Sequence, residues 1–273
     1  MSISRQNLSV VIVTFKSNQV IDNCIKSIPK DLNIIVVDNS NDKEFKEILE
    51  KNYRNVTCIL SPKNLGMGPG NNLGLKNVKT DFALILNPDV ILEKDTISEI
   101  INISKNIENF SIISPISIDA KYPNFQSLEN KIENNNGDSF FKVKSVDGFA
   151  MMLNLKKLNQ FKSFENKEYF DENFFMYLEN DDLCKRITEL NENIYIVNTA
   201  KIKHLGAKAV DSKYEYEIEL SRNWHWMWSK FYFNKKHNGF LFAFLNGFPT
   251  FFTSLLKSFL YLILNNKKKR NYF

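Results

Sequence analysis

Apolar runs alternate with amphipathic segments through the first hundred residues of the chain. Four of these runs are short and continuous, and they predict strands buried on both faces: 8–15, 33–37, 56–60 and 82–86. Helical spacing of apolar residues predicts helices between them at 18–28 and 44–49. Strands that alternate with helices are joined by right-handed crossovers, so the pattern predicts an α/β fold with a mixed, mainly parallel sheet flanked by helices.

The pattern becomes less regular beyond residue 110. Residues 120–142 are polar and predict a loop, whereas 147–153 are apolar and predict a strand. A helix is expected to begin near residue 179, and 194–197 predict a further short strand. These changes divide the chain into three parts: 1–110, 111–219 and 220–273.

The third part combines a long apolar stretch with a strong basic charge. It holds nine Lys and Arg residues and no acidic residue, so the rest of the chain contributes −4 to the total net charge of +5. Residues 240–264 are long and apolar enough for a transmembrane helix, but Asn246, Gly247 and Pro249 predict a break in the middle. Beyond that break, apolar side chains share one face of a predicted amphipathic helix.

Basic residues flank the apolar stretch on both sides, which favours a cytoplasmic location of both ends. We therefore expect a C-terminal apolar and amphipathic helical extension that is peripheral or monotopic at the anionic inner face of the cell membrane. Trp224, Trp226, Trp228 and Tyr232 just upstream would suit the membrane interface. The alternative is a helix pair that packs on the body or across a homodimer.

Composition narrows the possible classes of protein. The 273 residues are 43% hydrophobic and 13% aromatic, which excludes a disordered chain. The three cysteines are widely spaced and odd in number, so we expect a reducing compartment and no disulfide scaffold. No signal peptide is expected in residues 1–7, and nucleic acid is not an expected partner, because the basic residues bracket an apolar stretch.

Residues that follow the predicted strands carry the candidate chemistry, because ligands of parallel sheets bind beyond the carboxyl ends of the strands. The segment 64–74 packs four glycines and three asparagines into eleven residues. Glycines let backbone amides approach a ligand closely, and a helix that begins near Asn71 would direct its N-terminus at an anion. The segment matches neither the Walker pattern nor the dinucleotide fingerprint. The alternative is a flexible connector.

Two positions are candidates for holding a metal ion. Asp89 follows an apolar strand, where a carboxylate can hold a divalent cation that bridges phosphate oxygens, although Asn87-Pro88-Asp89 is also a common turn sequence. His204 follows another predicted strand and precedes a leucine and a glycine. It is either a second metal ligand or a structural histidine.

A cluster of acids is the candidate for general acid/base chemistry. Glu179, Asp181 and Asp182 crowd the start of a predicted helix behind an aromatic run. Such crowding should push their pKa values apart, as proton transfer requires. The alternative is helix capping by acidic residues, which suits Asp181 or Asp182 better than Glu179.

The ordered series of motifs resembles family 2 glycosyltransferases of the GT-A fold. In chain order the motifs are VVIVTF, VVDNS, NLGMGPGNNLG, LNPDV, DENFFMYLENDDL and HLG, and the resemblance covers roughly 8–235. The most similar subgroup is the bacterial rhamnosyltransferase-like enzymes of surface-polysaccharide assembly. The resemblance implies an inverting transferase that moves a sugar, rhamnose or similar, from a dTDP- or UDP-linked donor to a glycan or polyprenyl-linked acceptor.

The resemblance also assigns roles along the chain. Residues 1–110 would bind the nucleotide-sugar, and 111–219 would bind the acceptor and carry the catalysis. Mg²⁺ or Mn²⁺ would be held by Asp89, with His204 as the second ligand. The catalytic base would be Glu179, with Asp181 and Asp182 as alternates. The residues expected to bind substrate are Thr14, Phe15, Asp38, Asn39, Asn64, Gly66, Gly70, Asn72, Asn87, Asp147 and Gly148.

Two positions depart from the family pattern. The DxD-type element begins with Asn87, so only Asp89 can be a charged ligand, and the second acid of the ED-type motif is replaced by Asn180. These amides keep open a non-catalytic, membrane-bound protein that binds nucleotide-sugars. A nucleotidyltransferase is a further alternative, but it would carry a glycine-rich phosphate loop directly after the first strand, where residues 14–17 contain no glycine.

Overall fold

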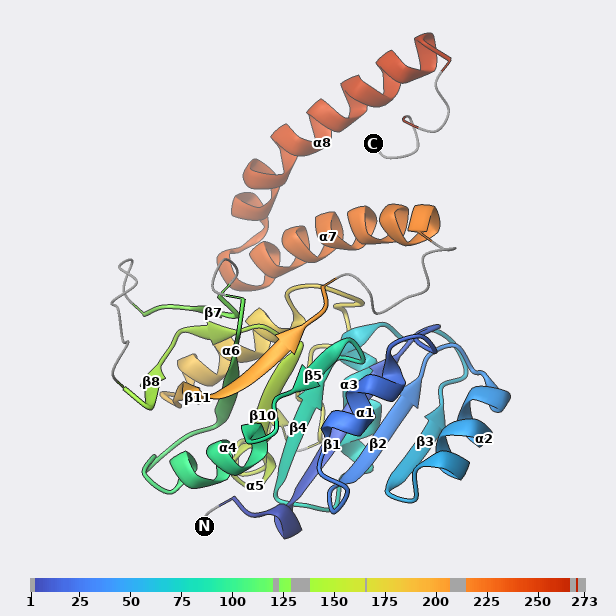
Figure 1. Cartoon of the computed structure of the whole chain (residues 1–273). Coiled ribbons are helices and arrows are strands. Elements are labelled where there is room, and N and C mark those ends of the chain that lie inside the picture. The colour runs from blue at the N-terminus through green and yellow to red at the C-terminus, as the bar shows by residue number, and fades with distance from the viewer. Residues whose placement is uncertain are drawn as a thin grey trace.

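Four parallel strands form the first part of the fold, seen in a computed structural model that describes residues 3–119, 123–128, 138–164, 166–206, 215–265 and 269 (Figure 1). The strands are β1 (Leu8–Thr14), β2 (Asn33–Asp38), β3 (Val56–Leu60) and β4 (Phe82–Leu86). They lie in the order β3-β2-β1-β4, and all neighbouring pairs are parallel. The four strands that the apolar runs predict are confirmed.

Three helices connect these strands: α1 (Ile21–Ser27), α2 (Lys43–Asn52) and α3 (Met67–Lys76). The short 3₁₀ helix η1 (Arg5–Asn7) precedes β1, and the helix α4 (Thr96–Ser104) follows after β4. The α1 and α2 helices lie where the sequence predicts them, and the Asp42 side chain caps α2 by accepting a hydrogen bond from the Phe45 amide at 3.0 Å. The α3 helix begins before the expected start near Asn71, because the chain turns at Gly66, whose φ is +80°.

The second part of the chain extends the same sheet beyond β4. Its strands are β5 (Val90–Leu92), β6 (Ile112–Ser117), β8 (Phe140–Lys142), β10 (Ala150–Asn154) and β11 (Ile194–His204), while β7 (Phe125–Gln126) and β9 (Ser145–Val146) pair separately. β10 runs antiparallel to β4 and β6, and β11 runs parallel to β6 and antiparallel to β5. The strands predicted at 147–153 and 194–197 are confirmed with shifted bounds. The loop predicted at 120–142 lies partly outside the described residues, and its described part contains the short strands β7 and β8, so the prediction of a loop throughout is wrong.

Apolar layers cover both faces of the sheet. The remaining helices of the body are α5 (Leu155–Leu158), η2 (Lys162–Phe164) and α6 (Glu179–Glu189). One layer contains residues of α1, α2 and α4, and the other contains residues of α3, α5 and α6. With both faces covered, the carboxyl ends of β1, β2 and β4 form the edge of the sheet that is left for ligands.

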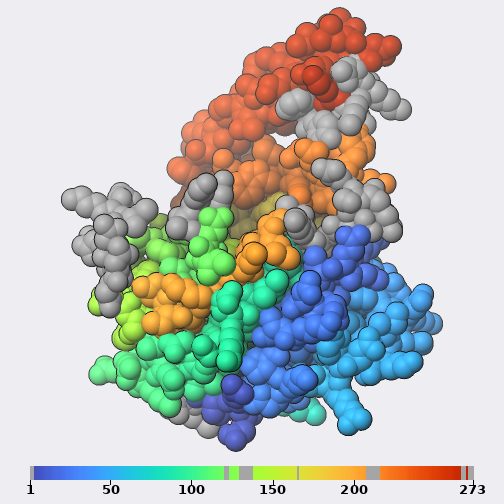
Figure 2. All heavy atoms as spheres, viewed as in Figure 1, coloured from blue at the N-terminus to red at the C-terminus, as the bar shows by residue number. Residues whose placement is uncertain are grey.

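Two long helices form the C-terminal extension. The α7 helix (Glu215–Asn238) lies across the carboxyl ends of the strands, and the α8 helix (Phe240–Ile263) follows after a one-residue turn at Gly239, whose φ is +89° (Figure 1). α8 packs on α7 and extends away from the body, where it stands out in red in Figure 2. Its large apolar side chains are exposed along its length, and Ala243 is its one buried residue among those the structure describes.

The predicted break at Asn246, Gly247 and Pro249 is wrong. α8 is one continuous helix with Pro249 inside it, and it is long and apolar enough to cross a membrane by length and composition. The proline forfeits only the bond to the carbonyl of Leu245, and the Asn246 side chain bonds back to the carbonyl of Phe242 at 2.9 Å, within the helix.

Several aromatic residues of α7 that would suit a membrane interface also contact the body. The Tyr232 hydroxyl donates a hydrogen bond to Asp171 at 2.9 Å, and the Trp228 indole N–H donates to the carbonyl of Asn173 at 3.4 Å. The Trp226 ring meets the edge of Tyr177. Trp224, Trp226 and Trp228 are nevertheless 69%, 46% and 45% exposed, so a place at the membrane interface stays a prediction. Part of α7 therefore packs on the body, as the alternative interpretation of a packed helix pair requires.

Candidate active site

Buried polar side chains fix the edge of the sheet where β1 and β2 end. Asp38 is buried, and its carboxylate accepts hydrogen bonds from the Thr14 hydroxyl at 3.1 Å and from the amides of Ser40 and Asp42 at 3.2 and 2.9 Å. Phe15 follows β1 and is half-buried. Asp38, which the resemblance assigns to the nucleotide, therefore already has three protein donors and holds the turn after β2 in place.

The glycine-rich segment packs closely on the chain around Phe175. The Gly66 carbonyl accepts a hydrogen bond from Asn39 at 2.9 Å, and the Gly66 amide donates to the Asn64 side chain at 3.0 Å. A Cβ atom on Gly66 would lie 2.1 Å from the Phe175 carbonyl oxygen, which also accepts the Met67 amide. Gly70 and Gly74 likewise lie against valines of β1. These glycines serve close packing inside the protein, a use that the sequence does not distinguish from approach to a ligand.

Asn72 ties the α3 helix to the same segment. Its amide group donates to the Phe170 carbonyl at 2.8 Å and its oxygen accepts the Phe170 amide at 3.0 Å, and the side chain is fully buried. This candidate substrate residue is thus engaged by the protein. Its neighbour Asn71 has a buried side-chain oxygen with no hydrogen-bond partner among the described residues, so Asn71 is the better placed of the two to meet a ligand.

Asp89 and His204 come together at the edge of the sheet. The register of β5 and β11 places His204 beside Val90, and the His204 Nε2 atom lies 3.4 Å from a carboxylate oxygen of Asp89. Asp89 is only 2% exposed. The imidazole ring stacks on Phe149 at 4.1 Å, which fixes its orientation. The sequence predicts both residues, and the strand pairing explains why they meet.

The donor atoms around this pair suit a divalent cation. The Oδ1 atoms of Asn87 and Asp89 are buried without a hydrogen-bond partner among the described residues. A carboxylate, an amide oxygen and an imidazole nitrogen are ligands that Mg²⁺ or Mn²⁺ accepts. No group of three His, Cys, Asp or Glu side chains in the described part of the chain could enclose a metal, so a cation here would take further oxygens from substrate phosphates and water.

Glu179 is a buried acid at the first position of α6. It is 8% exposed, and its Oε2 atom has no hydrogen-bond partner among the described residues. Burial raises the pKa of Glu179 to about 7, and the charge of Asp181 adds to the rise. Tyr177 and Leu178, just before it, have φ values of +71° and +64°. Two successive non-glycine residues in this region are strained and direct the chain abruptly into the helix.

The other two acids of the cluster have different surroundings. Asp182 is fully buried and pairs with Arg186 at 2.8 Å, with Lys236 at 2.6 Å and with His237 at 2.9 Å. It therefore anchors α7 to α6. Burial raises the pKa of Asp181, which is half-buried and bonds to Ser145. Of the two alternates to Glu179, only Asp181 has access to the site.

Asp147 and Gly148 line the same region. The Asp147 side chain is exposed, yet the surrounding protein raises its pKa to about 6, an effect that Asp181 increases and His204 opposes. Asp147 therefore lies close enough to Asp181 and His204 to respond to their charges, and the surface that these residues share with Glu179 and Asp89 is called the cleft below. Asn180 holds this strand end, because its amide donates to the Val146 carbonyl at 2.9 Å and its Cβ lies against Gly148. The amide that replaces the second acid of the family motif thus has a structural partner.

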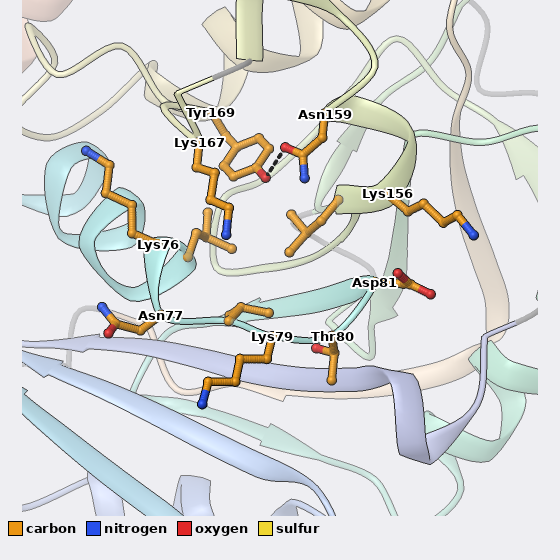
Figure 3. Close-up of a pocket in the computed structure, with 12 residues that line it drawn as sticks. Lys76, Asn77, Lys79, Thr80, Asp81, Lys156, Asn159, Lys167 and Tyr169 are labelled. Atoms are coloured by element: carbon orange, nitrogen blue, oxygen red, sulfur yellow. Dashed lines mark hydrogen bonds between the residues drawn. The ribbon is translucent and has the colours of Figure 1, made fainter.

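A separate cavity lies at the opposite end of the sheet. Its volume is about 540 Å³, and four lysines surround it together with Tyr169, whose hydroxyl donates to Asn159 at 2.7 Å (Figure 3). It opens beside the start of β4, whereas Asp89 and Glu179 lie beyond the carboxyl ends of the strands. The cavity therefore takes no part in the candidate site.

Comparisons with known proteins identify the family. The family described as glycosyl transferase family 2 matches residues 9–177. The chain belongs to this family. Agl10 of Haloferax volcanii, a low-salt glycan biosynthesis hexosyltransferase, is 30% identical over 209 residues, which are 69% of this chain and 64% of that protein. An uncharacterized glycosyltransferase of Rickettsia prowazekii, RP339, is 30% identical over 95 residues, 35% of this chain and 30% of that protein. The chain thus spans less than two thirds of these relatives.

Solved structures share the fold of this family 2 chain. GalNAc-T7, solved with UDP, GalNAc and Mn²⁺, superposes with a TM-score of 0.58 and 13% identity over 84% of this chain and 50% of that one. S. aureus TarS 1–349 gives a TM-score of 0.56 and 15% identity over 97% and 89%. TarS was also solved with UDP and with UDP-GlcNAc. The expected GT-A-type, mixed and mainly parallel sheet with a helical C-terminal extension is confirmed.

The sequence does not predict two polar side chains that lie near the site. Asn71 lies within the glycine-rich motif but carries no signal that separates it from Asn72. His225 on α7 has a buried Nδ1 atom without a partner among the described residues, and its ring stacks on Phe175 at 4.1 Å. The rarity of histidine in this chain was the one available signal, because α7 meets the site only through tertiary packing.

The pKa of Glu179 makes a prediction about stability. Below its ordinary value of 4.5 the carboxyl is protonated in both the folded and the unfolded chain. Between 4.5 and about 7 only the unfolded chain ionises, so the folded state loses stability as the pH rises. The Gln side chain of Glu179→Gln does not titrate. The free energy of unfolding of the variant minus that of the wild type should therefore be larger at pH 8 than at pH 4, by on the order of 3 kcal/mol.

Urea denaturation at both pH values measures this difference. Glu189→Gln, on the exposed end of the same helix, reports the general effect of removing one negative charge. A Glu179→Gln advantage that is equal at pH 4 and pH 8 would show that the native carboxyl ionises as it does in water.

Proposed function

We propose that this chain is an inverting glycosyltransferase that moves a hexose, rhamnose or similar, from a nucleoside-diphosphate sugar to a glycan or polyprenyl-linked acceptor. The observation that carries the proposal is the buried carboxyl of Glu179, whose Oε2 atom has no hydrogen-bond partner among the described residues and whose pKa of about 7 suits a general base, on the same side of the molecule as the Asp89 and His204 pair. Family membership supports the reaction class.

In this proposal the residues of the site have distinct roles. The Glu179 carboxylate accepts the proton of an acceptor hydroxyl while the oxygen forms a bond to the anomeric carbon. The bond from that carbon to the diphosphate oxygen breaks, and its electron pair leaves with the nucleoside diphosphate. One displacement inverts the configuration. Asp89, His204 and Asn87 would hold Mg²⁺ or Mn²⁺, which neutralises charge on a diphosphate when it is bound.

The relatives bear on the substrates. TarS has been solved with UDP and UDP-GlcNAc, and Agl10 is named for glycan biosynthesis. We therefore propose a UDP- or dTDP-linked hexose as donor. In this proposal 1–110 bind the donor and 111–219 bind the acceptor. Thr14, Phe15, Asn39 and Asn71 would line the donor side. The first three lie at or beside the carboxyl ends of β1 and β2, and Asn71 lies within α3 with its side-chain oxygen unpartnered among the described residues.

Replacement of Glu179 tests the proposed base. Glu179→Gln should bind donor normally and lose transfer by about 10²–10⁴-fold, because a sugar hydroxyl is a poor nucleophile without a positioned base. Wild-type kcat/KM should rise with pH through about 7, as the carboxyl ionises. The measurement is acceptor-dependent release of nucleoside diphosphate, with Glu189→Gln as the control.

Other outcomes of this assay identify the alternatives. Normal turnover by Glu179→Gln together with loss in Asp181→Asn would make Asp181 the base. A wild-type chain that binds nucleotide-sugar but never releases nucleoside diphosphate would be a binding protein. Release of pyrophosphate from a sugar phosphate and a nucleoside triphosphate would indicate a nucleotidyltransferase.

Replacement of Asp89 tests the metal. With wild-type protein, Mn²⁺ should increase the rise in melting temperature that UDP causes, because a ligand that binds the folded state stabilises it. In Asp89→Ala this gain from Mn²⁺ should vanish while the melting temperature without ligands stays close to normal. Asp95→Ala, an exposed residue before α4, is the matched control. An Asp89→Ala protein that keeps the full gain would remove Asp89 from the metal site.

We further propose that α8 inserts into an anionic membrane surface on the cytoplasmic side. Its exposed apolar side chains have no partner within the described chain other than α7, and basic residues surround the helix in the sequence. Each basic residue near an anionic leaflet contributes about 1 kcal/mol, an effect that salt screens.

Truncation tests the role of α8. A chain that ends at Asn238 keeps the α7 contacts, so it should stay folded and bind UDP but fail to sediment with anionic vesicles. Replacement of Lys267, Lys268, Lys269 and Arg270 by Gln should weaken vesicle binding mainly at low salt. If the full-length protein ignores the vesicles and the truncated chain unfolds, α8 is a packing or dimer element.

A further inference from the structure

The α7 helix runs antiparallel to the segment 171–178 that leads into Glu179. Lys236 pairs with Asp171 at 2.7 Å, near the start of that segment. The Ser229 hydroxyl donates to the Met176 carbonyl at 2.7 Å, and the Trp226 ring meets Tyr177 near its end. The N-terminal half of α7 therefore lies nearer to Glu179 than its C-terminal half does.

Arg222 is the next residue on this face of α7. It precedes Trp226 by four residues and Ser229 by seven, so its side chain projects from the same side of the helix. Burial raises the pKa of Tyr177, while the charge of Arg222 lowers it and that of Glu179 raises it. The Tyr177 phenol is thus close enough to respond to the charges of both Arg222 and Glu179.

The Arg222 guanidinium has no protein partner among the described residues. It is half-exposed and takes part in no hydrogen bond or ion pair there, whereas Lys236 on the same face pairs with two carboxylates. The nearby cleft carries Glu179, Asp181 and Asp147, which repel an anionic substrate. A half-buried arginine without a carboxylate partner beside such a cleft suits a planar, bidentate contact to phosphate.

His225 provides a second donor or acceptor one turn away. Its ring stacks flat on Phe175, with the planes 17° apart, and its Nδ1 atom is buried without a partner among the described residues. Burial lowers its pKa, so the imidazole is neutral and can make one hydrogen bond through each nitrogen. Buried polar atoms of this kind are normally satisfied by protein, ordered water or a ligand, so the Nδ1 atom of His225 is available to a ligand.

We propose that Arg222, with His225 beside it, binds the diphosphate of a substrate at the mouth of the cleft. This inference rests on the proposed function, which supplies two sources of one chemistry: the diphosphate of the donor nucleotide and the diphosphate of a polyprenyl-linked acceptor. The positive charge offsets the repulsion from the cleft carboxylates. α7 thereby contributes a ligand contact in addition to its packing on the body.

Binding measurements on charge variants test the proposal. Isothermal titration calorimetry with UDP and dTDP in the presence of Mn²⁺ measures affinity for the donor diphosphate. Sedimentation with neutral vesicles that contain polyprenyl diphosphate measures affinity for the acceptor diphosphate. Arg222→Gln should weaken one of these about tenfold to hundredfold, as expected for loss of a charged hydrogen bond. Binding of uridine and thymidine, which lack phosphate, should not change. Lys230→Gln, an exposed residue of the same helix, removes an equal charge and should have no effect.

The pattern of loss identifies the source. Weaker UDP or dTDP binding assigns Arg222 to the donor, and weaker binding of polyprenyl diphosphate assigns it to the acceptor. Arg222→Lys keeps the positive charge but lacks the paired N–H donors of the guanidinium, so it should show an intermediate loss of binding. This variant also tests the proposal if Arg222→Gln does not fold. Equal binding by Arg222→Lys, Arg222→Gln and Lys230→Gln in both arms overturns the inference while the proposed function stands. A wild-type chain that binds neither diphosphate overturns both.

Discussion

The position of Glu179, the proposed base, depends on one close contact, in which the Gly66 backbone lies against the carbonyl of Phe175. No side chain fits between them. Asn72 holds the same segment at Phe170, and Ser229 holds it at Met176 from the other side. A segment fixed at these points can keep Tyr177 and Leu178 in left-handed conformations that would otherwise relax.

Buried charge connects this segment to the C-terminal extension. Asp182 and Asp171 face Lys236, and Asp182 also bonds to Arg186 and His237. Although Asp171 is partly buried, hydrogen bonds from Lys236, Asn173 and Tyr232 lower its pKa to about 2. Removal of one partner would leave a buried charge uncompensated, which is far more costly than loss of a surface pair. α7 is thus an integral part of the body.

Much of the fold follows from the sequence, but less of the site does. Buried strands reveal themselves because apolar residues must fill both faces of the sheet, and strand ends then mark Asp89 and His204. Their meeting depends on the pairing of β5 with β11, which no local pattern encodes. Asp182 and Asn72 were expected to act in the site, but both bind other parts of the protein. The type of a polar residue does not reveal whether its partner is the protein or a substrate. Pro249 misleads because one lost hydrogen bond does not end a helix.

The single glycine between α7 and α8 limits how far the cleft can move. Two helices of 24 residues each meet at Gly239 with no flexible linker between them. With α8, about 36 Å long at 1.5 Å per residue, held in the membrane, α7 and the body would lie one residue away from the bilayer surface. Acceptor hydroxyls at one distance from the bilayer would reach Glu179, and those nearer or farther would not. The length of the acceptor would then be selected by the distance between its hydroxyl and the bilayer, and not by contacts within the cleft.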